Sequence, residues 1–510
     1  MPPSSPRPAL RGSLITVSVL AVACESAPIN APPDANETFD AGDDLAPSDV
    51  FVAPSDVSTA ADVSSTPDVT RDAPASYDAG PAPCAEVERF TPVFRSAIER
   101  WSSQDALGGW PEAPVVFVGS SSIRRWEGLA RAYTDYNPLQ RGVGGAQLGE
   151  IALYARELVT RHDPRAVVVY AGTNDLSAGV SASVVVERFR CLRHRVAQAL
   201  GRDRPVLFLG VVPTPARWSQ WPTARAVNTA VAELAASDPG LVYVDVATPF
   251  LATGSPPAAS LFVSDGLHLS ESGYALWNRA IRPALEAVIP PRPPKSAPSP
   301  ALAAGTRVLV DLGPNSAADG EDPPSPDHMG QHWNNWHSLT GGGEVLPGEQ
   351  RVDLVTSTGA RTHIDLVVAG GFLANGRRNG GLLWPEAARL GSLAVGSATG
   401  DYFYIQDADA PGALFLRGLD PSRTYTFRLF AARDATEVRI TRYTLAGANM
   451  ASVTLQTSGA GAGRNGATTN DDDVAVVRGV RPDAWGHVSL DVAVERGTYA
   501  YLAAFELAVE

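Results

Sequence analysis

The sequence lacks a basic stripe, a long hydrophobic run and a large number of cysteines. Lysine and arginine number 41 against 55 aspartates and glutamates, a net charge of −14, and the basic residues gather nowhere along the chain. The absence of a basic stripe argues against a nucleic-acid partner. The negative charge is local, because residues 25–83 hold 12 acidic residues and one basic residue, Arg71. The acidity therefore says little about a substrate.

The longest N-terminal apolar run, Gly12–Ala23, has 12 residues, fewer than the roughly 20 that span a bilayer. Preceded by Arg7 and Arg11, it is typical of an export signal. Small residues before Cys24 favour lipidation of that cysteine, Ala21 and Ala23 also fit ordinary secretory cleavage, and an uncleaved anchor is a third alternative. We expect residues 1–24 to be a signal peptide and the protein to be exported, as a bacterial envelope lipoprotein or a secreted protein. Membrane contact is expected only through a lipid on Cys24.

Two cysteines remain after Cys24. In an exported protein, Cys84 and Cys191 either form a disulfide or stay as buried thiols, and the sequence does not choose between these alternatives.

Two segments without apolar periodicity divide the chain. Residues 25–83 are rich in Ala, Pro, Asp, Ser and Thr and are predicted to be a disordered acidic linker. Residues 290–302 are predicted to be a stiff Pro-rich linker. The linkers delimit two folded domains, at residues 84–289 and 303–510.

The first domain alternates short β-branched runs with stretches of helical length. The predicted strands are Val115–Val118, Val167–Tyr170, Val206–Val212 and Val242–Val244, with a shorter extended piece at Pro138–Arg141. The predicted helices are Gln147–Arg161, Ser181–Leu200, Ala224–Ala236 and Glu271–Val288. This alternation predicts a parallel sheet with both faces covered, and such sheets bind ligands beyond the carboxyl ends of their strands.

The second domain has glycine-rich turns between alternating segments such as Thr424–Phe430 and His487–Ala493. This pattern predicts an antiparallel β-sandwich, of jelly-roll-like type.

Four motifs that carry polar groups follow predicted extended segments of the first domain. They are Gly119-Ser-Ser-Ser-Ile123, Gln140-Arg-Gly-Val-Gly-Gly145, Ala171-Gly-Thr-Asn-Asp175 and Ser264-Asp-Gly-Leu-His268. Together they contain the groups that ester cleavage by a serine needs: a base, an acid that orients the base, and donors for the oxyanion. His268 suits the base and Asp265 the orienting acid. The oxyanion donors would be the main-chain N–H groups of Ser121 and Gly145 and the side-chain amide of Asn174.

In order and spacing, these motifs resemble the blocks of the SGNH, or GDSL-type, hydrolases over about residues 86–289. The resemblance implies that Ser121 is the nucleophile, that Gly145 and Asn174 belong to the oxyanion hole, and that Asp265 and His268 complete the triad. Ser120 stands where the family usually has Asp, and Gln140 where it often has Asn. Because three serines are consecutive, Ser120 and Ser122 remain alternatives for the nucleophile.

The family implies a flavodoxin-like α/β/α fold with no metal and no cofactor. The expected function is that of an exported carboxylic-ester hydrolase, acting on a small ester or on an acylated polysaccharide such as an O-acetylated glycan. A lipolytic acylhydrolase or thioesterase, and an inert cell-surface glycan-binding lipoprotein, are the alternatives. Arg217 and Trp218 are predicted to contact the substrate.

The second domain more loosely resembles carbohydrate-binding β-sandwich modules of secreted hydrolases. Trp333, Trp336 and Trp384 would then stack on sugar, or else they pack in the core or at the rim. The spacing of His328, His332 and His337 is a weak indication of zinc, and Asn470–Asp473 is a weak indication of a calcium loop.

Overall fold

The computed structural model describes residues 84–292, 302–316, 319–338, 343–406, 411–464 and 467–510. The predicted signal peptide, Cys24, the acidic linker and most of the Pro-rich linker lie outside these ranges. Within them, no helix combines the length and the apolar character that crossing a membrane requires.

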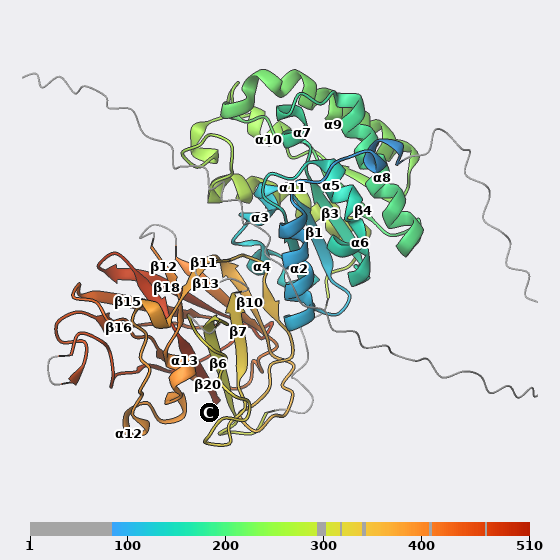
Figure 1. The fold of residues 1–510 in the computed structure, drawn as a ribbon. Coiled ribbons are helices and arrows are strands. Elements are labelled where there is room, and N and C mark those ends of the chain that lie inside the picture. The colour runs from blue at the N-terminus through green and yellow to red at the C-terminus, as the bar shows by residue number, and fades with distance from the viewer. Residues whose placement is uncertain (1–83, 293–301, 317–318, 339–342, 407–410, 465–466) are drawn as a thin grey trace, which may run out of the picture. The chain divides into compact units, whose positions relative to one another are not determined.

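A five-stranded parallel sheet forms the centre of the N-terminal half, surrounded by helices (Figure 1). The strand order is β2-β1-β3-β4-β5, in which β1 and β3 are neighbours and the connection changes direction between them. At such a switch point the carboxyl ends of the strands leave a crevice for ligands. The strands are β1 (Val115–Gly119), β2 (Pro138–Gly142), β3 (Ala166–Tyr170), β4 (Val206–Leu209) and β5 (Leu241–Val244). The predicted doubly covered parallel sheet is confirmed.

Helices pack on both faces of this sheet. Apolar side chains of α2, α5, α6, α8 and α9 share one core with Val116 and Val167, while those of α3, α4 and α11 share another with Val115 and Val168. Successive side chains of a strand point to opposite faces, so β-branched runs without polar interruption fit this environment. The helices of this half are α1 (Ala85–Glu88), α2 (Arg95–Gly108), α3 (Ser121–Arg124), α4 (Leu129–Ala132), α5 (Leu148–Leu153), α6 (Ala155–Leu158), α7 (Thr173–Ser177), α8 (Ala182–Leu200), α9 (Trp221–Ser237), α10 (Thr248–Leu251) and α11 (Glu271–Val288).

Two predicted elements differ in their extent. The single helix expected at 147–161 is divided into α5, α6 and a 3₁₀ turn at Thr160–His162. The strand expected at 206–212 ends at Leu209, because the Asn228 side chain takes over both main-chain groups of Val211, accepting from its N–H at 2.7 Å and donating to its carbonyl at 3.0 Å.

A disulfide joins Cys84, immediately before α1, to Cys191 in α8. The alternative that the sequence left open is therefore decided in favour of the bond. It closes a loop between residues 107 apart in sequence.

The C-terminal half is built from β-sheets, as predicted. A six-stranded antiparallel sheet, in the order β16-β15-β18-β13-β10-β9, shares one apolar core with a five-stranded sheet in the order β17-β14-β20-β6-β7 and with a four-stranded sheet in the order β19-β12-β11-β8. The one pair that departs from the antiparallel prediction among the described strands is β6 with β7, which run parallel. The strands are β6 (Arg307–Pro314), β7 (Asn334–Ser338), β8 (Glu344–Val345), β9 (Gln350–Arg351), β10 (Asp365–Gly370), β11 (Phe372–Asn375), β12 (Tyr402–Ile405), β13 (Gly412–Arg417), β14 (Tyr425–Phe430), β15 (Arg439–Ala446), β16 (Met450–Ser458), β17 (Ala475–Val480), β18 (Val488–Arg496), β19 (Ala500–Leu502) and β20 (Ala504–Val509).

Candidate active site

The turn from β1 into α3 presents Ser121 at the carboxyl edge of the sheet. Ser121 is the first residue of α3, where a main-chain N–H has no intrahelical acceptor. The preceding Gly119 allows β1 and β3 to approach, since a Cβ there would stand 2.0 Å from the carbonyl oxygen of Tyr170. Ser120 is fully buried and the Ser122 carbonyl accepts a hydrogen bond from Tyr274 at 2.7 Å. Of the three consecutive serines, the structure therefore directs Ser121 toward the site.

His268 and Asp265 come from a tight turn immediately before α11. His268 Nε2 lies 2.8 Å from Ser121 Oγ, and His268 Nδ1 lies 2.6 Å from Asp265 Oδ2. The other oxygen of Asp265 accepts the main-chain N–H groups of Leu267 at 2.8 Å and His268 at 2.9 Å. The turn thus fixes the carboxylate against the imidazole, and the structure brings together the three side chains that the motifs predicted.

The electrostatics of this turn keep Asp265 ionised. Partial burial acts to raise the pKa of Asp265, but the hydrogen bonds from the His268 ring and from two main-chain N–H groups outweigh it and lower the pKa to about 2. An ionised carboxylate on Nδ1 favours the tautomer whose Nε2 accepts a proton from serine.

Gly145 follows β2 with a φ of +81°, a conformation that favours glycine. A Cβ at this position would also stand 2.6 Å from Cζ of Phe94. Among the described residues, its N–H has no main-chain acceptor. This N–H is thus free to donate to a developing oxyanion, as the sequence predicted for it.

The Asn174 side chain is held at both ends. Its Nδ2 donates to the Ala146 carbonyl at 3.0 Å, and its Oδ1 accepts from Arg217 Nη1 at 3.0 Å. The same Arg217 nitrogen donates to the carbonyl and to the hydroxyl of Thr173, at 2.9 and 3.0 Å. Arg217 was predicted to contact substrate, and in the structure its side chain hydrogen-bonds Thr173 and Asn174, the first two residues of α7. Trp218, predicted beside it, is half-buried.

Several side chains support the site in ways that the sequence did not predict. Glu150 accepts the N–H groups of Val93 at 2.6 Å and Phe94 at 2.9 Å, which places Phe94 against Gly145. Gln140, at the position where the family often has Asn, donates to the carbonyls of Ile123 and Trp126 at the end of α3.

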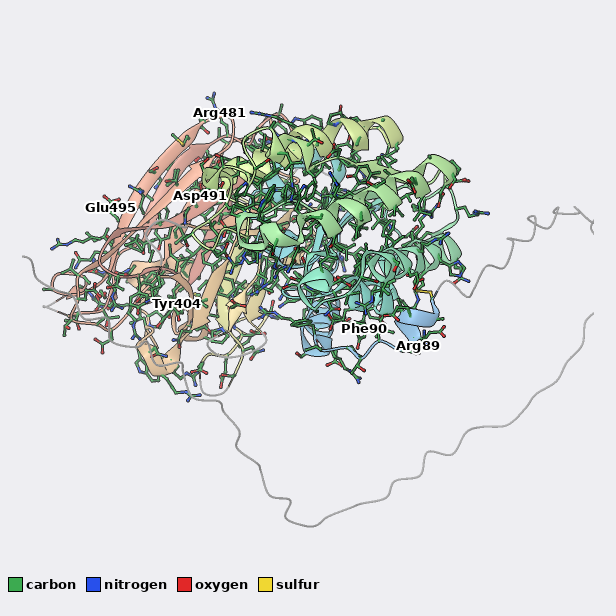
Figure 2. The ribbon with its side chains drawn as sticks, turned by 90° about the horizontal axis from the view of Figure 1, so that it is seen from above. Arg89, Phe90, Tyr404, Arg481, Asp491 and Glu495 are labelled. Carbon is green, nitrogen blue, oxygen red and sulfur yellow. A yellow bond between two sulfur atoms is a disulfide. The ribbon has the colours of Figure 1, made fainter. Side chains whose placement is uncertain are left out.

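A buried ion pair forms at Asp175, the residue after Asn174 in α7. Asp175 accepts the N–H of Leu148 and pairs with Arg188 at 2.8 Å. The Arg188 guanidinium also lies 4.8 Å from the ring centre of Phe90, which is labelled in Figure 2. Burial raises the pKa of Asp175. Asp175 ends one of the four motifs, but Arg188 and Phe90 lie outside all of them, so the sequence did not predict this ion pair.

Two hollows are lined by residues close in sequence to parts of the candidate site, although Ser121, Asp265 and His268 line neither of them. A cavity of about 10 Å³ is lined by Thr173, Arg217 and neighbouring apolar side chains. An open groove of about 340 Å³ runs beside α3 and has a mixed lining. Its polar, charged and aromatic side chains are Arg124, Arg125, Glu127, Glu344, Phe372, Tyr404 and Gln406, and its apolar side chains are Val345, Leu346, Pro347, Leu373, Ile405 and Pro411. Arg124 lies between this groove and the segment that carries Gly145, because its Nη1 lies 3.0 Å from where a Cβ on Gly144 would stand. Tyr404, from β12, is labelled in Figure 2.

The tryptophans of the C-terminal half differ in exposure. Trp333 and Trp336 are buried, which excludes them from stacking on a sugar and favours the packing alternative. Trp384 is 89% exposed. Among the described residues, no three or more His, Cys, Asp or Glu side chains gather as a metal site, so the histidine motif forms none there.

Comparison with known proteins found one family model and several solved structures that are similar to the N-terminal half. The model of the GDSL-like lipase/acylhydrolase family matches residues 108–276. The chain is similar to the structure of a GDSL-like lipase from Bacteroides thetaiotaomicron, at 22% identity over 38% of this chain and 98% of that one, with a TM-score of 0.32. It is also similar to an acetylxylan esterase from Geobacillus stearothermophilus, at 14% identity over 34% of this chain and 93% of that one, with a TM-score of 0.29. No curated protein matches the chain.

Proposed function

Because residues 108–276 form a hydrolase domain of the SGNH/GDSL esterase family, we propose that the chain hydrolyses short-chain acyl esters carried by a glycan, with Ser121 as nucleophile. The observation that carries the proposal is the continuous chain of hydrogen bonds from Asp265 through His268 to Ser121 Oγ.

The geometry supports a two-step acyl transfer. Ser121 Oγ attacks the ester carbonyl carbon while His268 Nε2 takes its proton. The N–H groups of Ser121 and Gly145 and the Asn174 amide donate to the oxyanion. His268 then protonates the leaving alcohol as the C–O bond breaks. Water, deprotonated by the same nitrogen, releases the acid and restores Ser121.

The hollows around the site favour a small acyl group and a polar alcohol. The cavity beside Thr173 holds about 10 Å³, about the space of a single water, and so has no room for a fatty chain. The groove beside Arg124 has the carboxylates, guanidinium groups and aromatic rings that bind sugars by hydrogen bonding and stacking. In this proposal the glycan lies along the groove with its ester at Ser121.

In the same proposal, the C-terminal half binds polysaccharide and the protein acts outside the cytoplasm. Trp384, with its ring exposed, suits stacking on a polysaccharide outside the active site. The Cys84–Cys191 disulfide is of a kind that persists in oxidising compartments, which supports export after cleavage of residues 1–24, with or without a lipid on Cys24.

The first experiment measures hydrolysis of p-nitrophenyl acetate by the full chain and by Ser121→Ala. We expect the substitution to lower kcat by about 10⁴-fold or more, since the nucleophile is lost. Ser122→Ala is the matched control and should keep most of the activity. Full activity in Ser121→Ala would contradict the assignment of the nucleophile.

A second experiment compares acetyl, butyryl, octanoyl and palmitoyl esters, an acetyl thioester and acetylated xylan. We expect kcat/KM to be highest for acetyl esters and acetate to be released from the polysaccharide. A strong preference for long chains would favour a lipolytic enzyme, and a preference for the thioester would favour a thioesterase. If the folded protein is inactive on every substrate, the result would favour a glycan-binding protein. That alternative would then be tested by retention of the chain on insoluble polysaccharide, which Trp384→Ala should abolish.

A further inference from the structure

Strand β6 carries one acidic side chain in an otherwise apolar run. Val310 and Leu312 point into the main core of the β-sandwich, whereas Leu309 packs in a second apolar cluster on the opposite face. Asp311 alternates with Val310 and Leu312 and therefore shares the face of Leu309. It is 2% exposed, and its Oδ1 has no hydrogen-bond partner among the described residues.

A second buried carboxylate stands on the same face. Asp401, immediately before β12, is 1% exposed, and the carbon of its carboxylate lies 2.2 Å from where a Cβ on Gly313 would stand. Gly313 is two residues beyond Asp311, so the carboxylate of Asp401 occupies the side-chain position next to Asp311. Its Oδ1 is likewise without a partner in the described part of the chain.

An amide oxygen adds to this pair. Asn335 of β7 lies opposite Asp311 in the parallel register, which places its side chain on the same face. Its Nδ2 donates to the Pro323 carbonyl at 2.9 Å, while its Oδ1 is buried and has no partner within the described ranges. Three oxygen atoms without donors are thus grouped on one face of β6 and β7.

Such a group is costly unless something positive joins it. Burial raises the pKa of Asp311 well above its usual value, and the charges of Asp401 and Asp322 act in the same direction. Burial and the charge of Asp322 also raise the pKa of Asp401, against the attraction of Arg377. Arg377 is 37% exposed and lies 3.8 Å from Glu321, and among the described residues its side chain forms no ion pair with Asp311 or Asp401. Buried polar atoms are normally satisfied, by protein groups, by water or by an ion.

We propose that Asp311, Asp401 and Asn335 hold a Ca²⁺ ion that stabilises the β-sandwich. Calcium takes six to eight oxygen ligands, and carboxylates, amide oxygens, main-chain carbonyls and water all serve, so two carboxylates suffice when other oxygens complete the shell. The absence of nitrogen and sulfur ligands disfavours zinc. The ion would offset the charge of both carboxylates and join β6, β7 and the start of β12.

The acidic loop at Asn470–Asp473, which the sequence indicated as a calcium loop, has fewer oxygen atoms free to bind an ion. Asn470 Oδ1 accepts the N–H of Asp473 and its Nδ2 donates to the carbonyls of Ala431 and Asp473, while Asp471 pairs with Arg464. Its polar groups already have partners, so we place the ion at Asp311 and not at Asn470–Asp473.

The test uses calorimetric titration of the chelator-treated full chain with CaCl₂, and thermal unfolding in CaCl₂ or EGTA. We expect one Ca²⁺ to bind and to raise the Tm of the wild type. Asp311→Asn and Asp401→Asn should each lower the affinity by about 100-fold, because the charge of the ligands sets calcium affinity. Asp473→Asn, an equivalent change in the acidic loop, should bind as the wild type does.

The sign of the stability change separates an ion site from a carboxyl pair that shares a proton. In EGTA both Asn variants should be at least as stable as the wild type, because a buried charge is removed. In CaCl₂ the wild type should be the more stable. No binding heat and no Tm shift of the wild type at millimolar CaCl₂ would overturn the proposal, whether or not the variants fold. A Ca²⁺ effect lost only in Asp473→Asn would also overturn it.

Discussion

At the scale of single residues, Arg217 hydrogen-bonds Asn174 and also lines the small cavity beside Thr173. Its Nη1 donates to Asn174 Oδ1 and to both oxygens of Thr173, so Arg217→Ala should free the amide to rotate. An oxyanion donor is typically worth about 10²–10³ in kcat, and a donor that is misplaced only part of the time should cost about 10-fold to 100-fold. We expect kcat for p-nitrophenyl acetate to fall by that amount with KM nearly unchanged.

Kinetics of the variant decide between the two roles of Arg217. A raised KM with kcat preserved would mean that Arg217 binds substrate, as the sequence suggested. Arg217→Lys supplies a control, since an ammonium group can replace one of the three hydrogen bonds but not the whole set. Its kcat should lie between those of the wild type and Arg217→Ala.

The ionisation of Asp265 makes the stability of the protein depend on pH. The pKa of Asp265 is about 2 in the folded protein, below the value of about 3.9 typical of an unfolded chain. A lowered pKa gives stability that is present above about pH 4 and is lost as the pH falls toward 2. Because the side chain is 41% exposed, solvent screening keeps this contribution at about 1 kcal/mol or less.

The lowered pKa of Asp265 can be checked by thermal unfolding and by the pH dependence of activity. Between pH 4 and pH 2 the Tm of the wild type should fall slightly more steeply than that of Asp265→Asn, which cannot ionise. Above pH 4 Asp265 is already ionised, so its carboxylate should add no proton to the acid limb of the wild-type kcat/KM profile. An acid limb steeper than one proton would contradict a permanently ionised Asp265.

At the scale of elements, the strands of the first half were predicted within one residue except where a side chain intervened. The β-branched runs determine β1, β3 and β5, because only buried strands suit them. The end of β4 depends on Asn228, a residue of α9 that is 17 positions away from Val211, and no local pattern reports it. The break between α5 and α6 was missed for a similar reason, since apolar periodicity continues across it.

The candidate site shows the same limit of local patterns. The sequence indicated five candidates, because each lies in a short motif after an extended segment and parallel strands bring their carboxyl ends together: Ser121, Gly145, Asn174, Asp265 and His268. Phe94, Glu150 and Arg188 were missed, because their roles depend on contacts across more than one element.

The disulfide between Cys84 and Cys191 holds the N-terminal segment of the first half against α8. Cys84 is tied to α8, and nine residues after it Val93 and Phe94 are tied to Glu150, which sets Phe94 against Gly145. Closing a loop of about 100 residues stabilises a fold by up to about 4.7 kcal/mol on chain-entropy grounds, and typically by about 2–4 kcal/mol. We expect Cys84→Ser with Cys191→Ser to lower the Tm by several degrees, measured by calorimetry without reductant.

Activity of the same double variant tests the link to Gly145. If the segment before α2 loosens, KM or kcat for p-nitrophenyl acetate should worsen well below the Tm. Glu150→Gln is the comparison, because it weakens the hold on Phe94 while the disulfide remains. Unchanged Tm in the double variant would contradict a structural bond between these cysteines.

At the scale of the whole molecule, α2 contacts the β-rich half through main-chain and charged groups. Val352 N–H donates to the Gly108 carbonyl at 2.9 Å, and Arg351 donates to Gln104 Oε1 at 3.0 Å. Arg100 pairs with Glu349 at 2.8 Å, and the Glu349 side chain is fully buried. Burial lowers the pKa of Arg351 to about 10. Charged groups are costly to bury unless paired, so these contacts join the halves only while their partners are present.

The pair of Arg100 and Glu349 allows a direct measurement of this dependence. Arg100→Met removes the cation and leaves the Glu349 carboxylate buried, with the Leu346 N–H at 3.0 Å as its remaining hydrogen bond among the described residues. Breaking such a pair costs about 3–5 kcal/mol, whereas replacing both partners by uncharged groups is often nearly neutral. We therefore expect Arg100→Met to lower the free energy of unfolding strongly, and Arg100→Met with Glu349→Gln to recover most of the loss.

Arg95→Met, in the exposed pair with Glu99, is the matched control and should cost about 0.5 kcal/mol or less. If the losses of Arg100→Met and Glu349→Gln simply add in urea unfolding, the two side chains do not interact, and the hydrolase half does not depend on this contact with the β-sandwich.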